Sequence, residues 1–485
     1  MTPRRPWPII LFLLSSSCSA QGPSFITNYI GDPEADMTVP QIIRHWGYPV
    51  EIHRVTTSDG YILQMHRIPR GKDEVNPPPN KPVVFLQHGL LCTSSVWLMN
   101  LPHQSAGMMF ADAGFDVWLG NMRGNSYSRG HQDKNIPNEK YWHFSWDEMA
   151  KYDIEAMVNY VLNVTNQESL YYMGHSQGTL TMFSKLSFND GFARKIKKFF
   201  AIAPVGTISY VKGLFRYLGE RSYEQLALFT ALFGDQEFLP NTFLSRWLTE
   251  FVCGLATSNP LCENFLFLVS GPDSQQLNKT RIGIYLAHNP AGTSIRNILH
   301  YCQMVRHKNL LAYDYGMDEN MKHYGMVVPI EYDLRRISGV PIYLYYSGSD
   351  WLATEKDVEG YLLPKLRKDT VAEVNKLPDF NHNDFLWGLR APDEIYRPII
   401  SIIQKDQPMN DPPKATTVRS VIKPASETNE DSDLLNTKEN NPELVDKAAP
   451  VTEKFVLAAD DDLLASSGMK SGEDADLLKN TGRDL

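Results

Sequence analysis

The stretch from Leu170 to Gly178 constrains this chain more than any other. Apolar residues 170–173 lead into Gly174-His175-Ser176-Gln177-Gly178, and a run with helical spacing follows at 179–186. Gly-x-Ser-x-Gly between a strand and a helix is typical of a nucleophile elbow, a turn so tight that glycines must flank it. Such a turn presents the Ser176 hydroxyl above the strand end. It also aims the Gln177 amide at the same space, where an oxyanion can be held.

Apolar strands alternate with helices on both sides of this motif. The sequence predicts strands at 83–86, 115–119, 170–173, 199–203 and 341–346, and helices at 106–113 and 152–161. Near-continuous apolar strands separated by helices indicate a parallel sheet buried on both faces. Two alternating runs around Ser58-Asp59-Gly60 predict a hairpin at 50–67. We therefore predict an α/β fold with a mostly parallel central sheet.

Composition divides the rest of the chain. Residues 1–20 predict a signal peptide, because two arginines precede a short apolar run and small residues ending at Ala20. That run is far shorter than the ~20 residues of a membrane span.

Helical runs without sheet strands predict a helical cap and lid at 207–332, between core segments 21–206 and 333–404. Residues 405–485 hold 17 Asp and Glu against 10 Lys and Arg, few aromatics and no period, which predicts a disordered acidic tail.

The elbow serine needs a base and an acid to become a nucleophile. In this type of fold the chain order is Ser, acid, His. Asp350 directly follows the last predicted strand, whereas Asp379 and Asp384 are competing acids that lie too near His382 to come from a separate strand end. His382 comes after the sheet strands resume at 341–346. The other histidines after the elbow fall in or beside the predicted cap: His288, His300, His307 and His323. We predict Ser176, Asp350 and His382 as the catalytic triad.

A second oxyanion donor is expected in the loop after the strand at 83–86. Gly89 in His88-Gly89-Leu90-Leu91 lets the backbone turn, so that the Leu90 amide faces the elbow. The predicted oxyanion hole is therefore formed by the amides of Leu90 and Gln177. This chemistry needs no cofactor, and no metal-ligand cluster is visible in the sequence. A net charge of −9 without a basic stripe argues against a nucleic-acid partner.

Secretion changes how cysteines and sequons are interpreted. Four cysteines remain after a signal peptide is removed, and three full pairings are possible: Cys92, Cys253, Cys262 and Cys302. Cys253 and Cys262 lie nine residues apart and are able to close a small loop. Asn163 and Asn278 begin Asn-x-Thr sequons, which in a secreted chain predict surface glycosylation sites.

The chain resembles the acid lipases, which include lysosomal acid lipase and gastric lipase. The resemblance runs from about residue 28 to 404 and rests on these motifs: Trp46-Gly47-Tyr48-Pro49, Thr57-Ser58-Asp59-Gly60-Tyr61-Ile62-Leu63, His88-Gly89-Leu90-Leu91, Gly120-Asn121-Met122-Arg123-Gly124-Asn125, Trp146-Asp147-Glu148-Met149-Ala150-Lys151-Tyr152-Asp153, Gly174-His175-Ser176-Gln177-Gly178, His288-Asn289-Pro290-Ala291-Gly292-Thr293-Ser294 and Asn381-His382-Asn383-Asp384-Phe385. It implies an α/β-hydrolase core with a helical cap and movable lid. The family triad falls on Ser176, Asp350 and His382, and its oxyanion donors fall on Leu90 and Gln177. Its cap disulfide matches Cys253–Cys262.

The resemblance also implies an activity. We expect a serine-dependent lipid ester hydrolase that acts on triacylglycerols or cholesteryl esters at a lipid–water interface, in the lysosome or outside the cell. Apolar segments 226–233 and 265–269 are candidates for a lid that meets lipid. A small-ester or thioester hydrolase and a weakly catalytic lipid carrier are the alternatives. Relatives usually read Asn-Asp-Leu-Leu-Ala-Asp at the acid, where this chain has Ser349-Asp350-Trp351-Leu352-Ala353-Thr354, so Trp351 is expected to reshape the acyl pocket.

Overall fold

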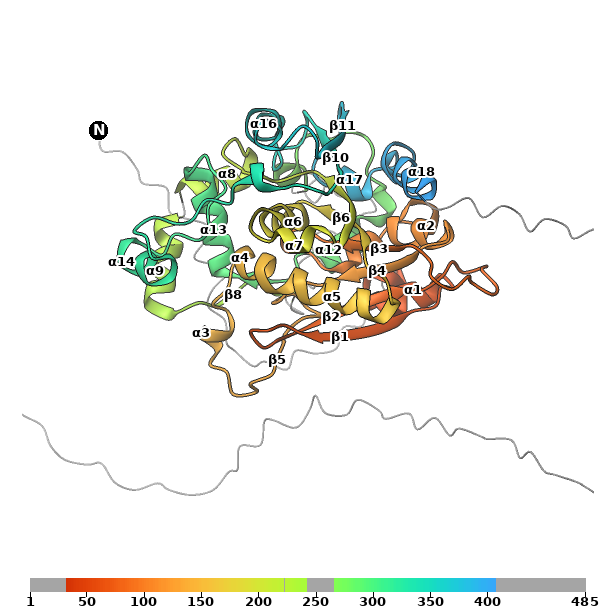
Figure 1. The fold of residues 1–485 in the computed structure, drawn as a ribbon, viewed down its shortest axis with the longest axis horizontal. Coiled ribbons are helices and arrows are strands. Elements are labelled where there is room, and N and C mark those ends of the chain that lie inside the picture. The colour runs from red at the N-terminus through yellow and green to blue at the C-terminus, as the bar shows by residue number, and fades with distance from the viewer. Residues whose placement is uncertain (1–31, 222, 242–265, 407–485) are drawn as a thin grey trace, which may run out of the picture. The chain divides into compact units, whose positions relative to one another are not determined.

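The computed structural model describes residues 32–221, 223–241 and 266–406, and these belong to one compact unit. A central sheet runs through it in the order β1-β2-β4-β3-β6-β7-β10-β11, with β5 paired to β2 (Figure 1). The strands are β1 (Glu51–Thr56), β2 (Tyr61–Ile68), β3 (Val83–Gln87), β4 (Asp116–Gly120), β5 (Gly130–His131), β6 (Leu170–His175), β7 (Ile196–Ile202), β10 (Ile342–Ser347) and β11 (Val371–Leu377). β2 pairs antiparallel with β1, β4 and β5, whereas the pairs from β4 to β11 are all parallel.

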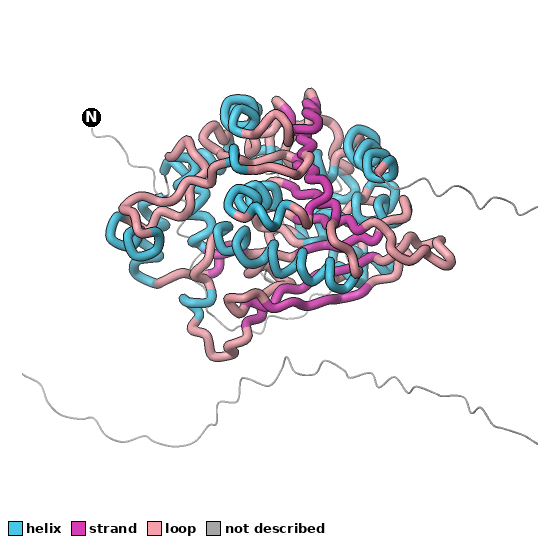
Figure 2. The backbone as a smooth tube through the Cα atoms, in the orientation of Figure 1, coloured by secondary structure: helices cyan, strands magenta, loops and turns pink. Residues whose placement is uncertain are grey.

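Helices pack around this sheet, and α5 and α6 lie side by side in front of it in Figures 1 and 2. β3, β4 and β6 are buried along their whole length, which is why their sequences are apolar without alternation. The helices are α1 (Val39–His45), α2 (Ala106–Asp112), α3 (Asn138–Tyr141), α4 (Trp146–Glu148), α5 (Ile154–Thr165), α6 (Gln177–Phe188), α7 (Asp190–Ala193), α8 (Gly213–Arg221), α9 (Tyr223–Phe233), α12 (Ile282–His288), α13 (Ile295–Arg306), α14 (Met317–Tyr324), α15 (Glu355–Asp357), α16 (Leu363–Lys365), α17 (Asp384–Trp387) and α18 (Arg397–Lys405).

The predicted α/β fold is confirmed, including the hairpin and the five buried strands. Two strands of the central sheet were not predicted: β5, which has only two residues, and β11 at the sheet edge, where half-buried and exposed residues interrupt the apolar pattern. The segment 207–332 adds no strand to the central sheet within its described part. It does hold a short antiparallel pair, β8 (Glu237–Phe238) with β9 (Thr293–Ser294), which the expectation of a purely helical segment did not include.

Several predictions fall on residues outside the described ranges. These are the signal peptide at 1–20, the Cys253–Cys262 disulfide, and the acidic tail beyond residue 406. The folded core continues two residues into the predicted tail, since α18 ends at Lys405 and the Asp406 carboxylate lies 2.5 Å from the Lys198 ammonium. None of the helices within the described ranges is long and apolar enough to cross a membrane.

A buried arginine links the β1–β2 hairpin turn to the start of α5. Arg123 is 1% exposed, and its Nε donates to Asp153 Oδ1 at 2.8 Å while its Nη1 donates to Asp59 Oδ2 at 2.7 Å. The guanidinium also lies 3.9 Å from the ring centre of Tyr61. The motif around Arg123 therefore joins three segments that are distant in sequence.

Replacing Arg123 with methionine should strongly destabilise the fold, because it leaves the fully buried Asp153 carboxylate without its cation. We expect the free energy of unfolding to fall by about 3–5 kcal/mol, measured by denaturant titration. Arg335→Met is the matched control, since Arg335 pairs with Asp333 at the surface and should cost less than about 1 kcal/mol. Equal losses in the two variants would contradict this assignment.

Candidate active site

Ser176 lies between β6 and α6 in a strained turn. Its backbone has φ 54° and ψ −118°, a conformation that non-glycine residues rarely adopt and that is costly unless the surroundings enforce it. The turn packs too tightly for side chains at its flanking glycines. A Cβ on Gly178 would lie 2.5 Å from the Gln87 carbonyl oxygen, and one on Gly174 would lie 2.7 Å from the Gly178 carbonyl. The Gly-x-Ser-x-Gly pattern is thus the local cause of the elbow.

Asp350 and His382 meet at the carboxyl ends of neighbouring parallel strands. Asp350 follows β10, His382 follows β11, and His382 Nδ1 lies 2.8 Å from Asp350 Oδ2. The Asp350 carboxylate is fully buried, and its Oδ1 accepts hydrogen bonds from the amides of Leu352 and Ala353 at 2.8 and 2.9 Å. These amides fix the carboxylate, so that it orients the imidazole and favours a proton on Nδ1.

The two competing acids face other groups. Asp379 forms an ion pair with Arg390, and Asp384 Oδ2 accepts the Asn381 amide at 2.7 Å. Burial raises the pKa of Asp384 to about 7. Of the candidate carboxylates, Asp350 is therefore the one that the structure brings to His382.

The loop after β3 lies against the elbow. A Cβ on Gly89 would be 3.1 Å from Ser176 Cβ, so any larger residue here would push the elbow serine or its loop by a few tenths of an ångström. His88 holds the loop: its Nε2 accepts the Met122 amide at 3.1 Å, and its Nδ1 donates to the Gly89 carbonyl at 2.8 Å. An imidazole that accepts at one nitrogen must be neutral, and burial lowers the pKa of His88 to about 4. Leu90 thus follows a rigid turn beside Ser176.

Sequence reasoning missed two groups that fix the His382 loop. His175, next to the elbow serine, donates from Nε2 to the His382 carbonyl at 3.0 Å. The Ser270 carbonyl accepts both the His382 amide at 3.0 Å and the Trp351 amide at 3.2 Å, so one oxygen joins the acid and base loops. The signal for this contact is Gly271, where a Cβ would lie 2.3 Å from the Ser349 carbonyl.

Trp351 contacts the predicted cap rather than standing apart from it. Its carbonyl accepts the Lys212 amide at 2.8 Å, and its ring packs so closely on Gly213, at the start of α8, that a Cβ added there would lie 2.9 Å from it. The indole therefore fills space between the acid loop and the first cap helix. Its expected effect on the acyl pocket stays a prediction.

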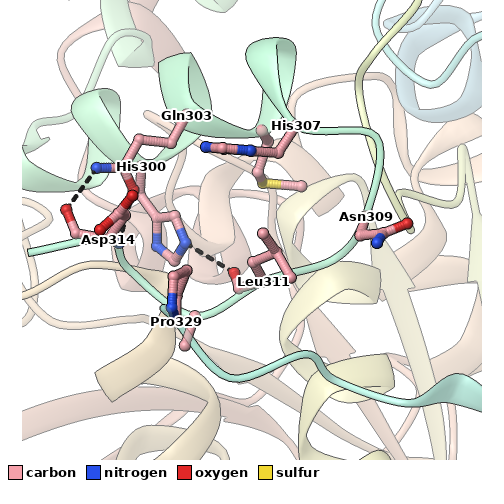
Figure 3. A pocket seen from close by; sticks show the side chains of 9 residues that line it. His300, Gln303, His307, Asn309, Leu311, Asp314 and Pro329 are labelled. Atoms are coloured by element: carbon pink, nitrogen blue, oxygen red, sulfur yellow. Dashed lines mark hydrogen bonds between the residues drawn. The ribbon is translucent and has the colours of Figure 1, made fainter. Parts of the chain in front are cut away.

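A small cavity in the cap segment lies among residues of α13 and the loop that follows it, as Figure 3 shows. Its void of about 10 Å³ holds roughly one water molecule. None of the predicted site residues lines it. The polar side chains around it already have partners: Gln303 Nε2 donates to the Asp314 carbonyl at 2.8 Å, and His300 lies 3.0 Å from the Leu311 carbonyl through Nε2 and 3.1 Å from Ser145 Oγ through Nδ1.

The predicted sequons and remaining described cysteines have distinct surroundings. Asn163 is exposed near the end of α5, whereas Asn278 is half-buried and accepts the Thr280 hydroxyl at 2.8 Å. Cys302 is buried on α13, and the half-buried Cys92 donates its thiol to the Leu90 carbonyl at 3.3 Å.

Asp147 is a buried carboxylate at the joint between α4 and the cap segment. Its oxygens accept the Tyr332 hydroxyl at 2.8 Å and the Tyr313 amide at 2.7 Å. Burial raises the pKa of Asp147 from its ordinary value of 3.8 to about 7. Burial and the neighbouring Asp147 also raise the pKa of Glu148. Between the ordinary Asp147 pKa of 3.8 and its raised value of about 7, the folded state binds more protons than the unfolded state. The free energy of unfolding therefore falls as pH rises from about 4 to 7.

Asp147→Asn should therefore flatten the pH dependence of stability. We expect the loss in unfolding free energy between pH 4.5 and 7.5 to shrink by roughly 1–3 kcal/mol, because each pKa unit corresponds to about 1.4 kcal/mol. Thermal and denaturant unfolding across that range measure it. The exposed Asp190→Asn serves as the control and should keep the wild-type slope. An unchanged slope in Asp147→Asn would show that the carboxylate ionises freely in the folded state.

The strand order, the elbow at Ser176 and the Asp350–His382 pair at the carboxyl ends of the strands define an α/β-hydrolase. Comparison with known proteins agrees. A family model described as a partial alpha/beta-hydrolase lipase region matches residues 39–101, and one described as the alpha/beta hydrolase fold matches residues 82–389.

Similar proteins identify the family of α/β-hydrolases to which the chain belongs. Lipase lipl-5 of Caenorhabditis elegans is 56% identical over 379 residues, covering 78% of this chain and 94% of the relative. Gastric triacylglycerol lipase of Bos taurus is 42% identical, covering 83% and 100%, and lipase member K of Homo sapiens is 44% identical, covering 77% and 92%. The chain belongs to the acid lipase family of α/β-hydrolases and is a carboxylic ester hydrolase.

Proposed function

We propose that Ser176 is the nucleophile of a neutral-lipid esterase and that Asp350 and His382 activate it. The observation that carries this proposal is the 2.8 Å contact between His382 Nδ1 and the fixed Asp350 carboxylate, at the carboxyl ends of the parallel strands, where the elbow serine also lies. A serine hydroxyl is a weak nucleophile at neutral pH, and an oriented imidazole supplies the base that it needs.

The reaction proceeds in two halves. His382 Nε2 takes the Ser176 proton as the serine oxygen attacks the ester carbonyl, and the tetrahedral oxyanion is held by the amides of Leu90 and Gln177. His382 then protonates the leaving alcohol, which leaves an acyl-enzyme. Water attacks the acyl group after giving its proton to His382, and the fatty acid departs as the proton returns to Ser176. Asp350 stabilises the imidazolium in both halves.

The proposed substrates are triacylglycerols and cholesteryl esters. The three relatives compared above are named lipases, and the name of one of them, gastric triacylglycerol lipase, states triacylglycerol as the substrate. Exposed apolar side chains also support a lipid interface. Leu228 on α9 is 60% exposed, Leu232 is 67% exposed, and Leu268 in the second candidate lid segment is 49% exposed. Such side chains are costly in water and favour contact with an aggregate.

A substrate panel tests the class of ester. Wild-type protein is assayed on triolein, cholesteryl oleate and a soluble short-chain ester from pH 4 to 8, with Ser176→Ala as the blank. We expect faster fatty-acid release from at least one of the two long-chain lipids than from the soluble ester. A preference for the soluble ester would favour the small-ester hydrolase, and lipid binding without turnover would favour the carrier.

We further propose that the protein works in the secretory pathway, in the lysosome or outside the cell. The signal-peptide pattern at 1–20, the exposed Asn163 sequon and the Cys253–Cys262 spacing support this location. The sequon at Asn278 is the weaker glycosylation site of the two, because its side chain is half-buried and already accepts the Thr280 hydroxyl. Mass spectrometry of the mature protein tests all three features.

A further inference from the structure

The motif at 288–294 has no part in the mechanism above, yet it leads into a segment that contacts both sides of the proposed oxyanion hole. This segment spans residues 291–297. At one end the Ala291 amide donates to the Leu91 carbonyl at 2.8 Å, next to the Leu90 donor. At the other end Asn297 Nδ2 donates to Gln177 Oε1 at 2.9 Å. One short cap segment thus holds both loops that supply oxyanion amides.

Asn297 is built into a fixed position. It is fully buried in the first turn of α13, where its own amide donates to the capping Ser294 hydroxyl at 3.0 Å. Its Oδ1 accepts the Trp146 amide at 2.9 Å, and its Nδ2 also donates to the Thr293 hydroxyl at 3.0 Å. Every polar atom of the side chain therefore has a partner, and the carboxamide is not free to rotate.

Gln177 is the residue whose position matters most for an oxyanion. It directly follows the strained Ser176 and begins α6, so its amide has no helical acceptor. Its buried side chain is held at both ends of the carboxamide, by Asn297 at Oε1 and by Met149 Sδ at 3.4 Å from Nε2. A side chain fixed in this way limits how far the residue 177 peptide can tilt.

We propose that Asn297 is a positioning residue that holds the Gln177 amide in line with the developing oxyanion and so couples the cap to catalysis. This inference rests on the proposed nucleophile and oxyanion donors. An oxyanion donor works only within about 2.7–3.1 Å of the charge. Without Asn297, the Gln177 side chain loses its partner and the peptide can move away from that distance. The loss then falls on the transition state and not on substrate binding.

The test compares Asn297→Ala with Gln303→Ala. Gln303 is a matched control because it is also a buried carboxamide on α13 with two hydrogen bonds, but both go to Asp314 within the cap (Figure 3). For a soluble ester, with active enzyme counted by covalent titration, we expect Asn297→Ala to lower kcat by about 10- to 100-fold and to leave KM within about threefold. Gln303→Ala should keep both values near wild type.

A trifluoromethyl ketone separates positioning from folding. The Ser176 oxygen adds to its carbonyl, the proton passes to His382, and the hemiketal oxyanion occupies the proposed hole. Its inhibition constant should rise in Asn297→Ala by the same factor as kcat falls. Gln177→Leu removes the same hydrogen bond from the core side while keeping the amide, so it tests the inference if Asn297→Ala does not fold. Gln177→Leu should show a similar loss of kcat, and the kcat of the double variant should be no lower than that of the less active single variant.

The outcomes distinguish this inference from the proposed function. If Asn297→Ala behaves like Gln303→Ala, or if the losses of the two single variants multiply in the double variant, the positioning role is wrong. If Ser176→Ala keeps full activity, the proposed function itself fails. An inactive Ser176→Ala beside an unimpaired Asn297→Ala would overturn only the positioning role.

Discussion

Replacing Ser176 with alanine should lower kcat for a soluble ester by about 10⁶-fold, the order of loss seen when a serine nucleophile is removed. The change deletes only an oxygen, and alanine must adopt the same positive φ of 54° that serine already tolerates. Stability and secondary structure should therefore stay near wild type. Initial rates and thermal unfolding measure the two effects separately.

Ser184→Ala is the control for this prediction. Ser184 lies on α6, eight positions after the elbow serine and fully buried, so the two substitutions have similar chemistry in the same part of the fold. Its activity should match wild type. If Ser176→Ala loses less than about tenfold in kcat, hydrolysis does not pass through this serine.

Asp350→Asn should lower kcat by about 10⁴-fold while KM changes little. An asparagine at this position can donate to His382 Nδ1 through its amide nitrogen. This places the imidazole proton on Nε2 and removes the acceptor that Ser176 requires. The amides of Leu352 and Ala353 keep an oxygen partner, so the loop should hold its shape. Steady-state kinetics from pH 5 to 8 provide the measurement.

Asp357→Asn is the matched control for the acid. Asp357 is another buried aspartate that follows β10, in α15, but its carboxylate accepts hydrogen bonds from the Tyr210 amide and the Thr354 hydroxyl and forms none with His382. Its kcat should stay within about threefold of wild type. Similar losses in Asp350→Asn and Asp357→Asn would mean that Asp350 supports the fold and not the imidazole.

The parts of the site that could be predicted from sequence are those fixed by a predicted strand end or by the chain order of the triad. Asp350 directly follows the predicted strand β10, whereas His382 was identified as the histidine that comes after the sheet strands resume, although the strand that it follows, β11, was not predicted. The elbow has its own local signal, since glycines are required at Gly174 and Gly178 by contacts of 2.5–2.7 Å. Fold class and candidate triad therefore follow from short-range patterns.

The rest of the site depends on contacts that leave little local signature. The Ser270 carbonyl bridges the acid and base loops through main-chain groups that any residue can supply, and the sequence marks this packing only by the neighbouring Gly271. Asn297 reaches Gln177 across 120 positions, and a buried asparagine looks like any other polar residue at the start of a helix. β11 was missed for a different reason: it is an edge strand with exposed side chains, so it lacks the apolar run of its neighbours.

The central claim is that Ser176 is the nucleophile, and covalent labelling tests it most directly. Wild-type protein is treated with a long-chain alkyl fluorophosphonate, digested and mapped by mass spectrometry. The account predicts one phosphonylated residue, Ser176, with labelling abolished in Ser176→Ala and greatly slowed in Asp350→Asn. A phosphonate on another side chain, or equal labelling of Ser176→Ala, would contradict it.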